Sequence, residues 1–181
     1  TYDVGYYNDR WQGIPVDGYG ALFQRMLRHP NVEIRLNTDY FAVRGSLPAH
    51  DLLIYSGPID QFFDYRHGRL GWRSVRFEKL LPDMGDFQGT SVMNECDVAV
   101  PHTRTHEFKH FPPERKFERP VVYREYSYAP RPGDDVYYPV RNDADLAIRA
   151  KYKAESARVP RVVFGGRLGA AIGWLVCNGY T

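Results

Sequence analysis

Residues 51–58 read Asp-Leu-Leu-Ile-Tyr-Ser-Gly-Pro, and this stretch decides the class of fold. Its centre, Leu52-Leu53-Ile54, is a short continuous apolar run that ends at Gly57-Pro58. Such a run is typical of a strand that is covered on both faces, as in the parallel sheets of α/β proteins. Residues 161–164, Arg-Val-Val-Phe, have the same character and end at Gly165-Gly166. We therefore expect two buried strands of an α/β domain.

The segments beside these strands support the same arrangement. Residues 19–28 carry apolar side chains at helical spacing and are stopped by His29-Pro30, so they predict a helix. Residues 31–36 alternate between polar and apolar and predict a strand. A second helix is expected to begin at about Asn142 or Asp143, which are good N-cap residues, and to run to about Ser156.

The middle of the chain has a different pattern. Between about 70 and 128, short alternating segments are separated by Pro and Gly, with no long helical pattern between them: 73–80, 87–94, 103–111 and 121–128. This pattern predicts an antiparallel sheet. The expected fold class is therefore mixed, α+β or α/β, in which a partial α/β domain carries an inserted antiparallel sheet domain. We expect the sheet domain at 69–137, between α/β parts at 1–68 and 138–181.

Bulk composition excludes several classes of protein. The formal net charge of the 181 residues is +2, so no strong field attracts nucleic acid or a membrane surface. No segment reads as a signal peptide or a transmembrane span. Cys96 and Cys177 form no CxxC motif and fit a reducing, cytoplasmic setting. Because the sequence opens with Thr1 rather than Met, we expect a fragment or a trimmed chain.

Gly165-Gly166-Arg167 follows a buried strand and is a candidate ligand-binding turn. Glycines at a strand end let the backbone approach a phosphate or a ring, and the Arg that follows supplies charge. Gly57-Pro58 ends the other buried strand, and the ligands of doubly wound domains collect at such ends. The alternative is a tight turn without a ligand. The chain contains no GxGxxG motif, so we expect no pyrophosphate loop within it.

Arg104 is a candidate diphosphate ligand in the expected strand 103–111. On a strand, Arg104, His106, Phe108 and His110 would share one face. His102, His106 and His110 recur at every fourth residue, which would suit a metal ion only on a helix. On a strand they lie too far apart for one ion, so we expect no metal site.

Tyr138 is a candidate ligand of a phosphate or a sugar, because Tyr137-Tyr138-Pro139 holds its hydroxyl at the end of an acidic loop. A loop Tyr that caps the core is the alternative. No Ser/His/Asp or Cys/His arrangement stands out, so the sequence does not predict a self-sufficient hydrolase.

Taken together, these segments resemble the UDP-galactopyranose mutases. The matching runs fall in the family's order over roughly 1–169: 13–19, 55–65, 85–90, 92–94, 104–111, 124–127, 137–140 and 164–168. The resemblance implies an intramolecular transferase, an isomerase that interconverts UDP-galactopyranose and UDP-galactofuranose. It also implies that the partial α/β region is an FAD-binding domain and that the chain is an incomplete piece of the enzyme.

The resemblance implies that reduced FAD is the cofactor and that UDP-galactose is the partner. Flavin N5 would be the nucleophile, through an N5-galactose adduct, so no side chain is a certain catalytic residue. The expected protein is a cytoplasmic flavoprotein of galactofuranose biosynthesis, which serves cell wall polysaccharide. Binding of nucleic acid or of a membrane is not expected, and a homodimer is left open.

By the same resemblance, Arg104 would clamp the UDP diphosphate and Tyr138 would donate a hydrogen bond to it. Asn94 would contact the substrate, and Trp11 stands near the diphosphate. The flavin would be contacted by Gly57, Pro58, Gly165, Gly166 and Arg167. A further, mobile-loop Arg of the family is expected upstream of Thr1.

The sequence departs from the family at two places. Trp11 replaces a usual Tyr, and an indole N–H can donate a hydrogen bond but cannot accept one. Residues 170–181 lack the family's Tyr-rich stretch and its Asp position. Two other classes therefore stay open. One is a non-catalytic sugar-nucleotide or flavin-binding remnant, and the other is a related FAD-dependent oxidase, which would not share the strand 103–111.

Overall fold

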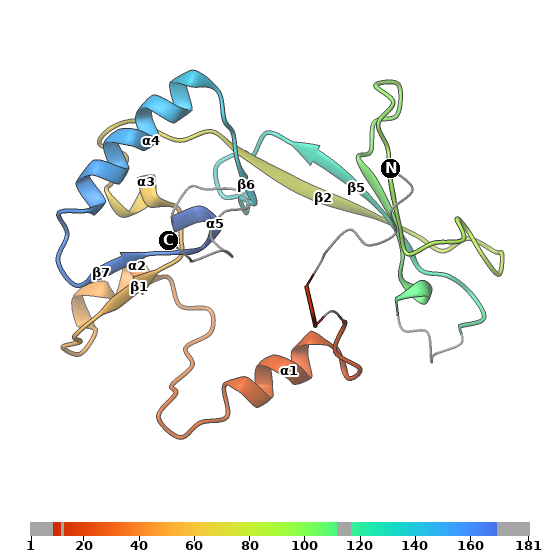
Figure 1. Ribbon diagram of the computed structural model, residues 1–181, viewed down its shortest axis with the longest axis horizontal. Helices are drawn as coiled ribbons and strands as arrows, with labels where there is room; N and C mark the ends of the chain where they lie inside the picture. The colour runs from red at the N-terminus through yellow and green to blue at the C-terminus, as the bar shows by residue number, and fades with distance from the viewer. Residues whose placement is uncertain (1–8, 12, 112–116, 170–181) are drawn as a thin grey trace. The chain divides into compact units, whose positions relative to one another are not determined.

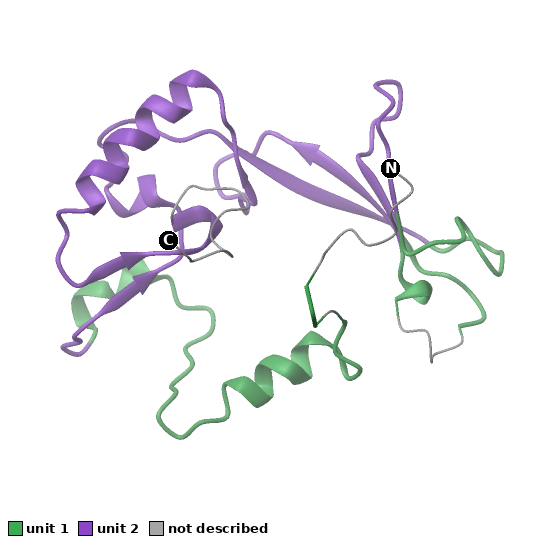
Figure 2. Ribbon diagram, in the orientation of Figure 1, with its two compact units in different colours: residues 1–47, 81–92, 107–122 green, residues 48–80, 93–106, 123–181 purple. Residues whose placement is uncertain are grey.

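The computed structural model describes residues 9–11, 13–111 and 117–169 (Figure 1). The divergent segment 170–181 and Cys177 lie outside them. The chain divides into two compact units, which Figure 2 shows in different colours. Unit 1 comprises 1–47, 81–92 and 107–122, and unit 2 comprises 48–80, 93–106 and 123–181.

The two predicted buried strands exist and are neighbours in unit 2. β1 (Leu53–Tyr55) pairs in parallel with β7 (Val162–Phe164), with Ile54 opposite Val163. Tyr55 is buried, but Ile54 is 69% exposed and Val163 50% exposed. Within the described residues, the prediction that both faces are covered is therefore wrong. One face of the pair packs inside the unit, and the apolar side chains of the other face are open.

The predicted antiparallel sheet in the middle of the chain is also present. Its five strands lie in the order β3-β4-β5-β2-β6: β2 (Trp72–Leu80), β3 (Val92–Asn94), β4 (Arg104–Glu107), β5 (Val122–Tyr128) and β6 (Tyr138–Pro139). β2 and β6 run antiparallel, with Arg73 opposite Tyr138. Mixed α and β structure with an antiparallel sheet is thus confirmed. The FAD-binding assignment and the domain boundaries stay predictions.

Two strands are shorter than the sequence pattern predicts. The segment 87–94 forms a strand only from Val92 onward, because the N–H groups of Phe87 and Gln88 donate to the Glu107 carboxylate instead of to a neighbouring strand. The segment 103–111 is a strand only to Glu107 and then forms a 3₁₀ turn, η2 (Phe108–His110). The single shared face expected from Arg104 to His110 therefore ends at His106.

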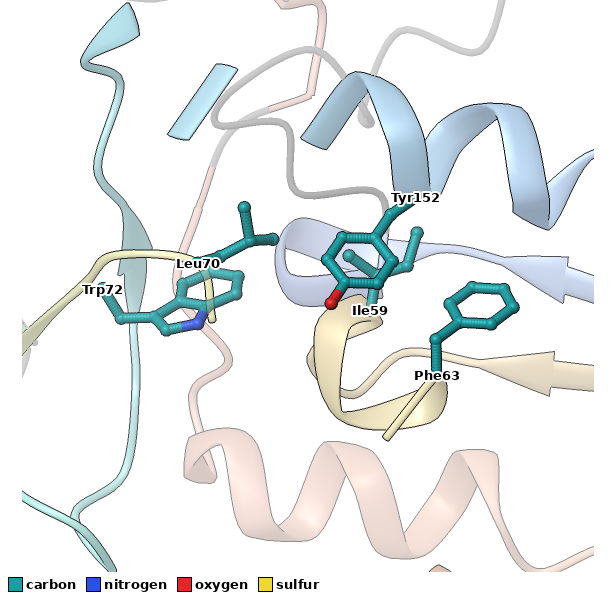
Figure 3. Packing of buried hydrophobic residues seen from close by; sticks show 5 residues of the cluster. All are labelled: Ile59, Phe63, Leu70, Trp72 and Tyr152. Carbon is teal, nitrogen blue, oxygen red and sulfur yellow. The ribbon is translucent and has the colours of Figure 1, made fainter. Parts of the chain in front are cut away.

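The core of unit 2 is built around one Tyr of helix α4 (Asp143–Ser156). Figure 3 shows the ring of Tyr152 among Ile59, Phe63 and Leu70, with Trp72 nearby. Ile59 comes from the short helix α3 (Ile59–Phe62). The Tyr152 hydroxyl donates to Gly68 O at 2.7 Å, so burial of the ring leaves its polar end satisfied. The helix begins as predicted, with Asn142 Oδ1 accepting the Asp145 N–H at 2.8 Å.

Unit 1 contains the predicted first helix but lacks the strand expected after it. α1 (Gly18–Met26) is followed by 31–36 without regular structure, and then by α2 (Tyr40–Val43) and the 3₁₀ turn η1 (Arg44–Ser46). Ile34 is 51% exposed and Leu36 79% exposed. An alternating pattern becomes a strand only when a neighbour completes the hydrogen-bond ladder, and no described residue pairs with 31–36.

The helices of the described residues are short or polar. None of them combines the length and the apolar character that crossing a membrane requires.

Candidate functional site

Arg104 and Asn94, both predicted from the sequence, lie together on adjacent strands. The Arg104 Nε donates to Asn94 Oδ1 at 2.8 Å, from β4 to β3. Along β4 the side chains alternate, with Arg104 and His106 partly exposed and Thr105 and Glu107 buried. The alternation turns Arg104 toward solvent, with its side chain 40% exposed. A guanidinium held at Nε keeps its outer nitrogens available for a planar anion such as phosphate.

Glu125 of β5 completes this group. Its Oε2 lies 3.6 Å from Arg104 Nη1 and 3.2 Å from His106 Nε2. The Glu125 side chain is 13% exposed, so the carboxylate is nearly withdrawn from water beside two basic side chains. Sequence reasoning did not assign a role to Glu125 or His106. The sequence feature that could have identified them is strand position, because His106 shares the face of Arg104 on β4 and Glu125 lies on the adjacent strand β5.

The two predicted strand-end turns also lie together, at the ends of β1 and β7. The Gly165 N–H donates to Tyr55 O at 3.0 Å. At Gly169, the end of α5 (Gly166–Gly169), an added Cβ would lie 2.6 Å from Tyr55 O, so only glycine fits. Gly166 has φ +72°, which glycine adopts without strain. Around Gly165, by contrast, an added Cβ would meet no described residue within 4 Å, so these residues leave its backbone open to a ligand.

Arg167 joins this turn to Tyr138. Its guanidinium centre lies 4.6 Å from the centre of the Tyr138 ring, and its Nη1 donates to Tyr137 O at 3.3 Å. The cation–π contact holds the ring, although Tyr138 as a whole residue is 42% exposed. Arg167, which was predicted to bind the cofactor, thus positions Tyr138, which was predicted to bind the substrate.

The predicted site residues therefore form two clusters in unit 2 rather than one. Arg104 and Asn94 lie on β4 and β3, and Tyr138 lies on β6, with β5 and β2 between β4 and β6 in the sheet. Gly57 and Pro58 follow β1, where the Pro58 O accepts the Tyr55 hydroxyl at 3.1 Å. Trp11 belongs to unit 1, is 83% exposed and contacts the Arg10 guanidinium at 5.3 Å from its ring centre.

Unit 1 contains a charged cluster that the sequence did not predict. The carboxylates of Asp86 and Glu107 and the imidazole of His110 offer ligand atoms within 4.8 Å of one another. However, the Lys109 ammonium lies 2.7 Å from Asp86 Oδ2 and 3.4 Å from Glu107 Oε1. The hydrogen bond from Lys109 lowers the pKa of Asp86, and the bond to Asp86 raises the pKa of Lys109. The cluster already contains its own cation.

Glu107 anchors the loop before β3. Burial alone would raise the pKa of Glu107, but the N–H donors of Gln88 and Phe87 and the bond to Lys109 outweigh it, so the pKa is lowered. The charged carboxylate therefore fixes the 86–89 turn to the end of β4. A side chain of this kind stabilises the strands that carry Arg104 and Asn94.

Unit 2 also contains a hollow of about 660 Å³, between α3 and the 129–134 loop. Asp60 lies in its lining, is 1% exposed, and accepts the Leu70 N–H at 2.9 Å. Burial raises the pKa of Asp60. Of the residues predicted for ligand binding, only Pro58 lines this hollow.

Comparisons with known proteins agree with the resemblance. The family model described as UDP-galactopyranose mutase matches residues 1–171. A probable UDP-galactopyranose mutase of Klebsiella pneumoniae is 39% identical over 169 residues, which are 93% of this chain and 43% of that relative. A dTDP-fucopyranose mutase of Escherichia coli is 38% identical, with 93% of this chain and 46% of that relative covered. A UDP-galactopyranose mutase of Mycoplasma pneumoniae is 31% identical, with 87% and 42% covered. The chain spans less than half the length of these relatives.

Proposed function

Because this chain belongs to the UDP-galactopyranose mutase family, we propose that the protein of which it is part interconverts UDP-galactopyranose and UDP-galactofuranose. Within that isomerase, this chain would supply the diphosphate-binding face of the sheet and one edge of the FAD site.

The observation that carries the proposal is the Arg104–Asn94 pair. A hydrogen bond of 2.8 Å fixes the guanidinium at Nε, while its side chain remains 40% exposed. A diphosphate needs this kind of rigid fork, because two parallel N–H donors match two phosphate oxygens. The role of these residues would be to hold UDP near the sugar after the sugar–phosphate bond breaks, so that UDP can return to the sugar.

The residues at the ends of β1 and β7 fit a flavin. Gly165 offers open backbone, and Gly166 and Gly169 hold a turn that a side chain would disturb. Gly57, Pro58 and Arg167 would complete this edge. When bound, reduced FAD would supply the nucleophile for the anomeric carbon of the sugar.

Tyr138 would position the diphosphate and would not transfer a proton. The Arg167 guanidinium lies over its ring, and its hydroxyl would donate to a phosphate oxygen. A lone Tyr hydroxyl beside a cation is well suited to a hydrogen bond with an anion. Trp11 would donate its indole N–H where the family usually has a Tyr hydroxyl.

A second candidate is supported by the relative from Escherichia coli. Its name specifies a dTDP-linked fucose, and its identity of 38% is close to the 39% of the Klebsiella pneumoniae relative. Both names describe a nucleoside diphosphate sugar, and a diphosphate clamp serves either. The choice of base and sugar would then depend on residues outside the Arg104–Asn94 pair.

We further place the reaction in the cytoplasm, as a source of galactofuranose for cell wall polysaccharide, with UDP-galactose as the substrate. The exposed thiol of Cys96 is unpaired and suits a reducing compartment. A homodimer remains compatible with this placement.

The test is the interconversion itself, measured by chromatography of UDP-galactofuranose incubated with the full-length protein. We expect conversion to UDP-galactopyranose with reduced FAD and none with oxidised FAD. dTDP-fucofuranose in a parallel reaction distinguishes the second candidate. Absence of conversion of both substrates by a protein that carries reduced FAD would refute the proposal.

A further inference from the structure

The carboxylate of Glu125 is shared by two basic side chains of β4. Its Oε2 lies 3.2 Å from His106 Nε2 and 3.6 Å from Arg104 Nη1. The side chains of Glu125 and His106 are 13% and 16% exposed, whereas that of Arg104 is 40% exposed. The acid and the imidazole are therefore the inner members of the group, and the guanidinium is the member that reaches solvent.

The distances rank these two contacts. A separation of 3.2 Å is within hydrogen-bond reach and 3.6 Å is not, so Glu125 is hydrogen-bonded to His106 and only attracted to Arg104. Arg104 is fixed instead by its Nε bond to Asn94. The negative charge of Glu125 thus faces the guanidinium without occupying it.

Charged groups of β2 have partners of their own on β5. On β2, Arg76 lies 3.9 Å from the centre of the Tyr126 ring, and Glu78 accepts the Tyr126 hydroxyl at 2.6 Å. Beside the cluster lie the ring of Phe77 of β2, centred 6.2 Å from that of His106, and the amide of Asn94 of β3. The Arg73 guanidinium of β2 also lies on this face, where its Nε donates to Ser127, two residues from Glu125 on β5, at 3.1 Å. Within the part of the chain that the structure describes, the ion pairs of Glu125 are those with His106 and Arg104 of β4.

We propose that His106 is a positioning residue that sets, through Glu125, how strongly Arg104 binds the diphosphate of a sugar nucleotide, an inference that rests on the proposed function. A protonated His106 holds the Glu125 carboxylate and offsets its charge. A neutral His106 leaves the full negative charge facing both the guanidinium and an incoming phosphate. Histidine is the side chain that changes its charge between about pH 5 and pH 8. Diphosphate binding therefore tightens as the pH falls.

The experiment measures UDP-galactose binding from pH 5.5 to 8.5 by calorimetry, with the full-length protein and oxidised FAD so that the sugar is not turned over. The diphosphate of UDP-galactose is a diester and keeps its charge over this range. Uridine is the matched probe without phosphate. The variants are His106→Gln and Glu125→Gln, with His67→Gln as control, because His67 has a carboxylate partner at 2.7 Å in Glu155 but lies outside the sheet.

In the wild type we expect the UDP-galactose affinity to rise about two- to fivefold toward low pH, the size of the coupling between partly exposed charges. Uridine binding stays constant, and His67→Gln keeps the wild-type slope. His106→Gln loses the slope. Glu125→Gln also loses it, and binds at every pH about as tightly as the wild type does at pH 5.5. The glutamine variant of Glu125 keeps the side-chain shape and decides the question if His106→Gln does not fold.

A wild-type slope in both His106→Gln and Glu125→Gln would overturn the inference. Arg104→Ala separates this failure from failure of the proposed function. Loss of UDP-galactose affinity in Arg104→Ala, with an unchanged slope in the other two variants, refutes the role of His106 alone. An unchanged affinity in Arg104→Ala refutes the diphosphate role of Arg104 and, with it, the role of His106, whereas the mutase proposal is tested separately by the conversion assay.

Discussion

Arg104→Ala removes the one guanidinium that β4 presents to solvent beside Asn94. The substitution deletes the Nε bond of 2.8 Å and every contact that the outer nitrogens would make with a diphosphate. It should leave the sheet intact, because the buried side chains of β4 are Thr105 and Glu107 on the opposite face. The expected effect is therefore on substrate and not on folding.

The magnitude follows from the number and exposure of the lost contacts. One hydrogen bond to a charged group contributes about 1.5–3 kcal/mol, and a fork can make two. Solvent reaches the guanidinium, which is 40% exposed, and the neighbouring Glu125 reduces its net charge. We expect a total loss of about 2–4 kcal/mol in transition-state stabilisation. This corresponds to about a 30- to 700-fold loss of kcat/KM.

The assay is ring interconversion of UDP-galactofuranose by the full-length enzyme with reduced FAD, together with the affinity for UDP. Arg104→Lys should recover only part of the loss, because an ammonium cannot form the planar fork. Arg76→Ala, which removes an Arg from a neighbouring strand where it contacts Tyr126, is the matched control and should behave like the wild type. Wild-type kinetics and UDP affinity in Arg104→Ala would refute the diphosphate site.

Three further predictions concern Tyr138, the cofactor and Glu107. Tyr138→Phe should cost about 0.5–3 kcal/mol, roughly two- to two-hundred-fold in rate, with an unshifted pH profile and with Tyr137→Phe as control; a loss of about 10²–10⁴-fold with one limb of the profile gone would make Tyr138 a proton-transfer residue. These 181 residues expressed alone should not retain FAD, since they contain no GxGxxG loop, and a flavin absorbance near one equivalent in the purified chain would contradict this. Glu107→Gln should lower the free energy of unfolding by about 1–3 kcal/mol at pH 7, measured with urea, because the N–H groups of Phe87 and Gln88 lose a charged acceptor. The pKa of Glu107 is lowered in the folded state, so its contribution to the free energy of unfolding is complete above the ordinary pKa of a carboxyl group and is lost as the pH falls below about 4. The wild type should therefore lose this part of its stability in acid. An equal loss of stability in acid by Glu107→Gln would count against this role of Glu107.

The elements that sequence reasoning predicted well are those whose signal is local. α4 has an N-cap at Asn142, and it begins at Asp143 as expected. β1 and β7 are apolar runs bounded by Gly, and they are present within a residue or two of their predicted ends. Their parallel pairing links residues far apart in the chain, and the two runs alone do not predict it.

The errors arise where a distant partner decides the outcome. Residues 31–36 alternate like a strand, yet none of the described residues supplies a ladder for them. The pattern at 87–91 is also strand-like, but Glu107 captures its N–H groups. Neither the capture nor the missing ladder can be read from the local pattern, because both depend on side chains brought near by the fold.

The candidate site was predicted by residue type but not by arrangement. Arg104 and Asn94 came from strand position and family resemblance, and their hydrogen bond gives them a common role. Arg167 was assigned to the cofactor and Tyr138 to the substrate, whereas in the structure the Arg167 guanidinium lies over the Tyr138 ring. Glu125 was missed as a site residue, because the contact between its carboxylate and an Arg of another strand produces no pattern in the local sequence.

The most direct test of the central claim is a crystal structure of the full-length protein with UDP bound. We expect a diphosphate oxygen within about 3 Å of the Arg104 guanidinium, with Nε still donating to Asn94. A diphosphate bound elsewhere, with Arg104 still facing Glu125 and solvent, would contradict it.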